Sequence, residues 1–179
     1  MKQQIQFRKA YISFGANLAF AGQAPEQTIL AAMQALDDAD LQLINCSSLW
    51  ASPAWPDAND PSFVNAVALF MCHLTPLRLM NRLGRMENRY GRVRNKPNAP
   101  RTLDLDLISY GGLVSNTRRV KLPHPGAGSR AFVLLPLHEI APDWKHPITA
   151  EPIGQMIADL PVQDKSETKL LKTVQIDIA

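Results

Sequence analysis

"PRTLDLDLISY", residues 100–110, is the stretch of the 179-residue chain that decides its fold. Leucines at 103, 105 and 107 alternate with Asp104 and Asp106, and an apolar run follows. Alternation with a period of two is typical of a half-buried β-strand, so we predict a strand over residues 101–112. Side chains two residues apart on a strand point to the same side. The leucines therefore face a core, and both carboxylates share the opposite face.

Two carboxylates on one strand face are candidate ligands for a cation, although a solvated surface is the more common reason for such a pair. The Cα atoms of Asp104 and Asp106 should lie roughly 6.5–7 Å apart. Like charges this close raise the pKa of one group unless a cation lies between them. Hard oxygen ligands suit Mg²⁺, and two Mg²⁺ ions about 3.5–4 Å apart are the arrangement used for in-line phosphoryl displacement. The alternative for this pair alone is a solvated outer face of the sheet, with the acids paired to Arg101.

Basic residues gather just before this strand. Between Arg78 and Arg101 the sequence holds eight basic residues and one acid, a local charge of +7 against +3 for the whole chain. Such a field needs an anionic partner such as phosphates, nucleic acid or acidic lipid, unless it is simply a solvated basic face. Arg92, Arg94 and Arg101 approach the carboxylates from a Gly- and Pro-containing loop. Arginines beside a carboxylate pair favour a Mg²⁺-nucleotide, whose metal needs the acids and whose oxygens need the guanidinium groups.

The rest of the chain alternates strand-like and helix-like segments. We predict strands over 9–17, 41–52, 63–74 and 101–112, helices over 24–40, 76–90 and 130–142, a weaker helix over 153–160 and an edge strand over 172–178. The segment 63–74 is apolar on both faces and should be central. The first six elements follow the order β-α-β-β-α-β of a ferredoxin-like fold. We therefore predict an α+β protein with an antiparallel sheet and helices packed on it, forming one domain over residues 1–179.

Composition narrows the class of protein further. The chain is 46% hydrophobic and 20% charged, as in an ordinary globular protein. No apolar stretch approaches the roughly 20 residues of a membrane span, and we find no signal peptide. Cys46 and Cys72 have no metal-type spacing, which suggests buried thiols in a reducing compartment. We expect a cytoplasmic monomer that binds neither membrane nor nucleic acid.

Several motifs resemble one family, the 6-hydroxymethyl-7,8-dihydropterin pyrophosphokinases of folate biosynthesis. These are "GRVR" (91–94), "PRTLDLDL" (100–107), "PHP" (123–125) and "RAFVLLPL" (130–137), with support from "YISFGANL" (11–18) and "FVNAVA" (63–68). The resemblance covers about residues 10–145. It implies transfer of pyrophosphate from ATP to the hydroxymethyl group of the pterin, with release of AMP and with two Mg²⁺ ions at the site.

The resemblance also implies roles for individual residues. The metal ligands would be Asp104 and Asp106, which would be catalytic together with Arg92. The ATP site would comprise Glu87, Arg92, Arg94, Arg101, Leu107, Lys121, His124 and Arg130. The pterin pocket would comprise Ser52, Pro53, Trp55, Phe63, Asn65 and Phe132.

The chemistry of these side chains agrees with such a pocket. A flat, polar bicycle is well held between aromatic faces, and Asn65 offers both a donor and an acceptor to its edge. Core packing is the alternative for Phe63 and Phe132, and a purely structural role is the alternative for His124. Two other functions stay open on the sequence: an RNA-binding module built on a ferredoxin-like sheet, and another two-metal phosphotransferase such as a nucleotidyl transferase.

Overall fold

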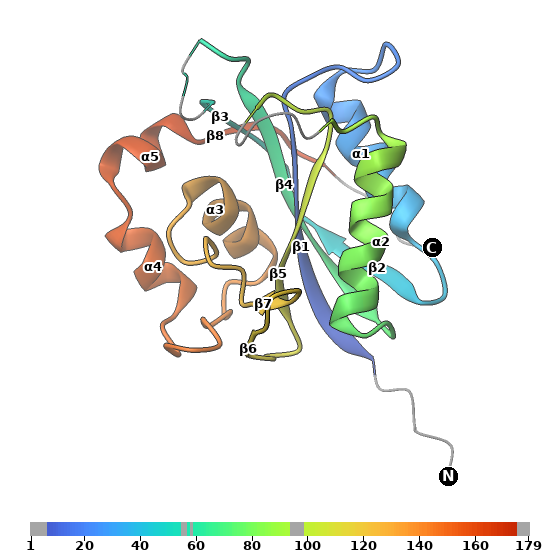
Figure 1. Ribbon diagram of the computed structural model, residues 1–179. Helices are drawn as coiled ribbons and strands as arrows, with labels where there is room; N and C mark the ends of the chain where they lie inside the picture. Colours follow the sequence, from blue (N-terminus) through green and yellow to red (C-terminus); the bar gives the residue numbers. More distant parts are fainter. Residues whose placement is uncertain (1–6, 55–56, 58, 94–98, 175–179) are drawn as a thin grey trace.

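The computed structural model describes residues 7–54, 57, 59–93 and 99–174 (Figure 1). Its strands are β1 (Arg8–Ala16), β2 (Leu41–Cys46), β3 (Leu49–Ser52), β4 (Phe63–Cys72), β5 (Asp104–Tyr110), β6 (Ser115–Asn116), β7 (Lys121–Leu122) and β8 (Lys169–Lys172). Its helices are α1 (Pro25–Leu36), α2 (Pro76–Arg89), α3 (Ala131–Ile140), α4 (Ile153–Asp159) and α5 (Val162–Glu167). None of the helices in these described ranges is long and apolar enough to cross a membrane.

The main sheet has the strand order β5-β1-β4-β3-β8, and β2 also pairs with β4. All of its pairings are antiparallel. As predicted from its apolar sequence, β4 is central and is buried along nearly its whole length. The predicted α+β fold, an antiparallel sheet with helices packed on it, is confirmed.

Helices cover both faces of the sheet (Figure 1). On one face α1 and α2 enclose a core that includes Phe14, Phe70 and Leu105. Opposite them, α3 and α4 enclose a second core that includes Val67 and Ile108. Strand alternation explains this division, because neighbouring residues of each strand point into different cores. The two layers leave one part of the second face open, and the candidate site lies there.

Some element boundaries differ from the predicted ones. The predicted strand over 41–52 is two strands, β2 and β3, and the predicted helix over 24–40 ends at Leu36. The C-terminal strand β8 lies at Lys169–Lys172, whereas the predicted 172–178 reaches beyond the described residues. The short helix α5 and the β6–β7 hairpin were not predicted, because their few residues carry no hydrophobic periodicity.

Candidate active site

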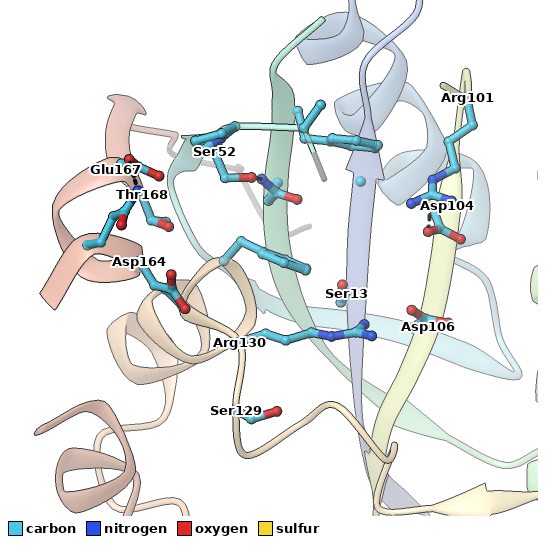
Figure 2. A pocket seen from close by; sticks show the side chains of 18 residues that line it. Ser13, Ser52, Arg101, Asp104, Asp106, Ser129, Arg130, Asp164, Glu167 and Thr168 are labelled. Carbon is cyan, nitrogen blue, oxygen red and sulfur yellow. Dashed lines mark hydrogen bonds and ion pairs between the residues drawn. The ribbon is translucent and has the colours of Figure 1, made fainter. Parts of the chain in front are cut away.

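A cleft of about 620 Å³ lies over the face of the sheet that carries α3 (Figure 2). Three neighbouring strands form its floor: Ser13 and Gly15 on β1, Phe63 and Asn65 on β4, and Asp104 and Asp106 on β5. The strand register explains this grouping, since Gly15 pairs with Asn65 on one side and with Asp104 on the other. A Cβ atom on Gly15 would lie 3.6 Å from Oδ1 of Asn65 and 3.8 Å from Cβ of Asp104. Because Gly15 has no side chain, the space between Asn65 and Asp104 at the centre of the cleft floor stays open.

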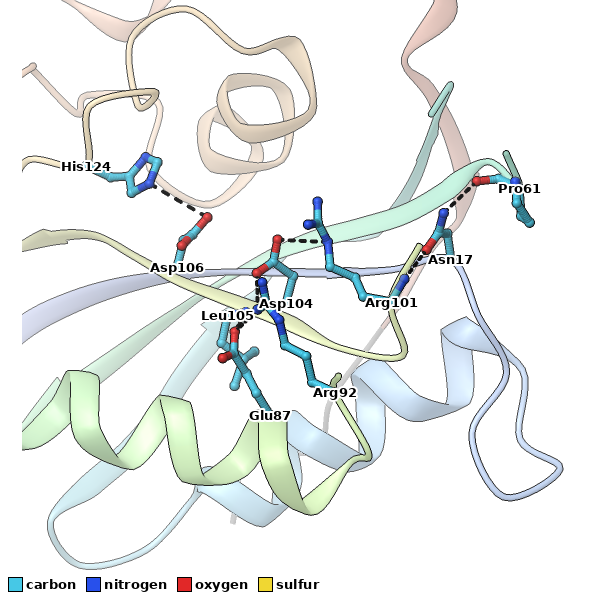
Figure 3. Close-up of polar contacts among 9 residues, drawn as sticks. All are labelled: Asn17, Pro61, Glu87, Arg92, Arg101, Asp104, Leu105, Asp106 and His124. Carbon is cyan, nitrogen blue, oxygen red and sulfur yellow. Dashed lines mark hydrogen bonds and ion pairs between the residues drawn. The ribbon is translucent and has the colours of Figure 1, made fainter. Parts of the chain in front are cut away.

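The two carboxylates share the cleft face, as the sequence predicted, but they have different partners (Figure 3). Both oxygens of Asp104 contact arginines: Oδ1 pairs with Nη1 of Arg92, and Oδ2 lies 3.1 Å from Nε of Arg101. Among the residues that the structure describes, the one ion-pair partner of Asp106 is His124, whose Nε2 lies 3.8 Å from its Oδ2. Burial, and after it the charge of Asp104, raise the pKa of Asp106 above its ordinary value; the charges of His124 and two arginines oppose this rise. Asp106 is thus the carboxylate more open to a cation.

Arg92 forms an ion pair with Glu87, a residue near the end of α2 that is only 3% exposed. Oε1 of Glu87 accepts hydrogen bonds from the Arg92 guanidinium and from the backbone N–H of Leu105, the latter at 2.9 Å. Glu87 therefore joins α2 to β5 and turns Arg92 toward Asp104. A buried carboxylate is stable only with such partners, because removing its charge from water is costly.

Arg101 is fixed by the end of β1. Its backbone N–H donates to Oδ1 of Asn17 at 2.7 Å, and its carbonyl accepts from the N–H groups of Asn17 and Leu18 at 3.0 and 3.2 Å. The side chain of Asn17 also donates to the carbonyl of Pro61 at 2.9 Å. The guanidinium lies 5.0 Å from the ring centroid of Phe63. Sequence reasoning missed Asn17, because its side chain contacts Arg101 and Pro61, which lie 84 and 44 positions away, and no local pattern indicates such contacts.

The loop before α3 brings His124 and Arg130 to the same end of the cleft. The backbone of His124 donates to the carbonyl of Ile108 at 2.8 Å, and its Nδ1 accepts from the N–H of Gly126 at 3.1 Å. Because Nδ1 is an acceptor, the ring proton of the neutral histidine is on Nε2, facing Asp106. A Cβ atom on Gly126 would lie 2.6 Å from Nε of Arg130, so glycine leaves the space that this guanidinium occupies.

The other end of the cleft is apolar and amide-lined. Phe63 and Phe132 line it, together with Pro53 and Ala54. Asn65 is 5% exposed, and its Nδ2 donates to Oγ of Ser52 at 3.0 Å. That bond fixes the amide and leaves its Oδ1 for the cleft.

Residues 11–142 match the family described as 7,8-dihydro-6-hydroxymethylpterin-pyrophosphokinase (HPPK). The chain belongs to this family. A relative named 2-amino-4-hydroxy-6-hydroxymethyldihydropteridine pyrophosphokinase from Haemophilus influenzae is 36% identical over 164 residues, which are 91% of this chain and 96% of the relative. The Pseudomonas aeruginosa protein of the same name is 38% identical over 141 residues, 78% of this chain and 85% of the relative. The HPPK assignment confirms the expected class of enzyme, an ATP-dependent diphosphotransferase.

The fold is also that of solved HPPK structures. The crystal structure of wild-type Plasmodium falciparum HPPK-DHPS matches 88% of this chain with a TM-score of 0.66, at 12% identity. The match spans 42% of that longer chain. At this identity the likeness shows the fold alone.

The structure brings most of the predicted HPPK site residues together. Nine of them line the cleft: Ser52, Pro53, Phe63, Asn65, Arg101, Asp104, Asp106, Arg130 and Phe132. Arg92 and His124 approach the carboxylates from the side, and Glu87 contacts Arg92. Trp55 and Arg94 lie outside the described residues.

Two predicted ATP-site residues lie elsewhere. The alternation that turns Asp104 and Asp106 to the cleft turns the Leu107 side chain into the α1–α2 core, and its place in the ATP site stays a prediction. Any contact of Leu107 with a nucleotide has to come from its backbone. Lys121 is exposed on β7 and does not line the cleft.

Proposed function

We propose that this HPPK chain transfers the pyrophosphoryl group of ATP to the hydroxymethyl group of 6-hydroxymethyl-7,8-dihydropterin and releases AMP. One observation carries the proposal: a single cleft joins a carboxylate–arginine end to an aromatic, amide-lined end. The first end suits a metal-bound triphosphate, and the second suits a flat polar bicycle. In this arrangement the hydroxymethyl group of the pterin points toward Asp104 and Asp106.

The aromatic, amide-lined end of the cleft would bind the pterin through ring contacts and a hydrogen bond. The rings of Phe63 and Phe132 would flank the bicycle, and Oδ1 of Asn65 would accept a hydrogen bond from its edge. The Ser52 hydroxyl holds the Asn65 amide in this orientation through the 3.0 Å bond. A buried amide with a fixed acceptor also discriminates against ligands that have no matching donor, because its lost hydrogen bond to water is then not replaced.

Asp104 and Asp106 would hold two Mg²⁺ ions. The donor set fits, since two carboxylates share one face and the pKa of Asp106 is raised by burial and then by the charge of Asp104. Within the described part of the chain no group of three or more His, Cys, Asp or Glu side chains is placed to bind a metal, so phosphate oxygens and water would complete the coordination. When bound, such ions lower the pKa of the substrate hydroxyl and stabilise charge on the leaving oxygen.

The surrounding cationic side chains would stabilise the triphosphate. As the hydroxymethyl oxygen forms its bond to the β-phosphorus, the bond from that phosphorus to the oxygen bridging the α-phosphate breaks, and this oxygen leaves with AMP. Arg92 and Arg101, which contact Asp104 without a nucleotide, would transfer to phosphate oxygens and free Asp104 for metal. His124 would donate from Nε2 to a phosphate oxygen.

The test compares AMP release from ATP and the pterin for the wild type, Asp104→Ala and Asp106→Ala. Loss of metal-dependent charge stabilisation should reduce kcat roughly 1,000-fold or more in each variant. Asp143→Ala, an exposed acid outside the cleft, is the matched control and should keep full activity. Near-normal turnover in both cleft variants would contradict the metal assignment. Release of pyrophosphate in place of AMP would identify a nucleotidyl transferase.

A further inference from the structure

The turn at the C-terminal end of α2 determines where the side chain of Arg92 starts. The N–H of Gly91 donates to the carbonyl of Asn88 at 3.0 Å. The next N–H, that of Arg92, donates to the carbonyl of Glu87 at 3.1 Å. These two bonds form a Schellman motif, in which the residue after the helix cap takes a positive φ, and Gly91 has a φ of 73°. Arg92 therefore binds Glu87 twice, through its backbone and through its guanidinium (Figure 3).

An aromatic side chain from the loop between β1 and α1 packs against this turn. The ring of Phe20 fills the space beside Gly91, so that a Cβ atom on Gly91 would lie 2.8 Å from Cε2 of Phe20. The same ring lies against Tyr90, the C-cap residue of α2, with the ring centroids 5.5 Å apart. Phe20 thus contacts the two residues that immediately precede Arg92. Neither Phe20 nor Tyr90 belongs to the motifs that resemble the HPPK family.

The loop that carries Phe20 has a strained backbone. Phe20 and Gln23 exchange backbone hydrogen bonds of 3.0 and 2.9 Å and enclose a two-residue turn. Both central residues have a positive φ, 50° at Ala21 and 79° at Gly22. Such a turn favours glycine at both positions, because a Cβ atom makes a positive φ unfavourable. Strain of this kind persists only where the surrounding structure fixes the residue, and it is common near functional sites. The turn thus holds Phe20 at a defined position beside α2.

We propose that Phe20 is a positioning residue for Arg92, because its packing fixes the turn from which the Arg92 guanidinium reaches the cleft. The inference rests on the proposed function, in which Arg92 moves from Asp104 to the triphosphate. Without the ring, the turn has a space beside Gly91 into which it can shift, and the guanidinium meets the phosphate oxygens in a wider range of positions. A misplacement of about 1 Å in a group that acts on the reacting atoms can reduce the rate roughly 100-fold.

The experiment measures AMP release from ATP and the pterin at saturating Mg²⁺ for the wild type, Phe20→Ala and Phe20→Tyr. Phe20→Ala should lower kcat roughly 10-fold and change the KM for the pterin by less than about twofold, because the altered contact is to the triphosphate. Phe20→Tyr keeps the ring and should recover most of the activity. Phe7→Ala is the matched control, since this exposed ring packs against His73 and does not line the cleft, and it should behave as the wild type.

A double-mutant cycle separates positioning from simple packing. If Phe20 acts through Arg92, Phe20→Ala should change neither kcat nor the affinity for a non-hydrolysable ATP analogue once Arg92→Ala is present. Independent roles would instead multiply, and the double variant would be slower than Arg92→Ala alone by roughly the same 10-fold factor. Gly91→Ala tests the same contact from the other side, because its methyl group would displace the ring. It should lower kcat only while Arg92 is present, and it provides the test if Phe20→Ala does not fold.

The outcomes distinguish the inference from the proposed function. Wild-type kcat in Phe20→Ala and Gly91→Ala, or losses that multiply with that of Arg92→Ala, would overturn the inference and leave the proposed function intact. A lower melting temperature with kcat retained would likewise overturn it, because Phe20 would then only stabilise the fold. Absence of AMP release by the wild type would instead overturn the proposed function.

Discussion

Asp106 faces His124 on the floor of the cleft, and its surroundings change its titration. Its pKa is raised in the folded protein, mainly by burial and then by the charge of Asp104. A carboxyl group with a raised folded-state pKa destabilises the fold when it is ionised. This cost is fully present above the raised pKa and disappears as the pH falls below the unfolded-state pKa. Asp106→Asn should therefore increase the free energy of unfolding at neutral pH in the absence of metal, and the gain should vanish in acid.

The gain should be at most about 1 kcal/mol, because the Asp106 side chain is 38% exposed and solvent screens its charge. Denaturant unfolding with a chelator, at pH 7 and again in acid, measures it against Asp143→Asn as a surface control. Adding millimolar Mg²⁺ should raise the unfolding free energy of the wild type but not of Asp106→Asn, since only the wild type keeps the Asp106 carboxylate to bind the metal. A variant less stable than the wild type at pH 7 without metal would show that the ionised carboxylate stabilises the fold.

The break between β2 and β3 depends on side chains that replace strand-to-strand hydrogen bonds. Oγ of Ser47 accepts a hydrogen bond from the N–H of Val67 at 3.0 Å, and the N–H of Ser48 donates to the carboxylate of Glu139 on α3 at 3.0 Å. Glu139 also accepts from Oγ of Ser48 at 2.7 Å and from Nε1 of Trp50 at 3.1 Å. Its carboxylate thus joins α3 to the sheet beside the cleft.

Glu139→Ala should lower the free energy of unfolding by about 1–3 kcal/mol, because the buried N–H and hydroxyl of Ser48 lose their acceptor. Urea unfolding measures this against Asp143→Ala, an exposed acid for which the structure describes no hydrogen bond or ion pair. Trp50, which also contacts Glu139, pairs with Asn65 in the sheet, so pterin affinity should fall as well. An unchanged midpoint would mean that water satisfies Ser48 equally well.

These elements show where prediction from the sequence succeeds and where it stops. The strand β5 and its paired carboxylates follow from local alternation, which needs no knowledge of the rest of the chain. The split after Cys46 depends on Glu139, a contact across 91 positions for Ser48, and nothing local indicates it. Helix α5 has six residues and none of them is buried, so it carries no periodic signal. Its place in the cleft is set by the pairing of β8 with β3.

The cleft as a whole is divided into two ends that should respond differently to salt. At one end Arg92, Arg101 and Arg130 surround the carboxylates, and at the other Phe63 and Phe132 would enclose the neutral pterin ring. Long-range attraction of a triphosphate is screened when the Debye length shortens from about 10 Å at 0.1 M to about 3 Å at 1 M salt, whereas burial of a neutral ring is not. Raising salt from 0.05 to 0.5 M should weaken binding of a non-hydrolysable ATP analogue roughly 3- to 10-fold. Binding of 6-hydroxymethylpterin should change less than twofold. Calorimetry at fixed Mg²⁺ measures both affinities. Equal weakening of both ligands would mean that charge, and not ring stacking, holds the pterin.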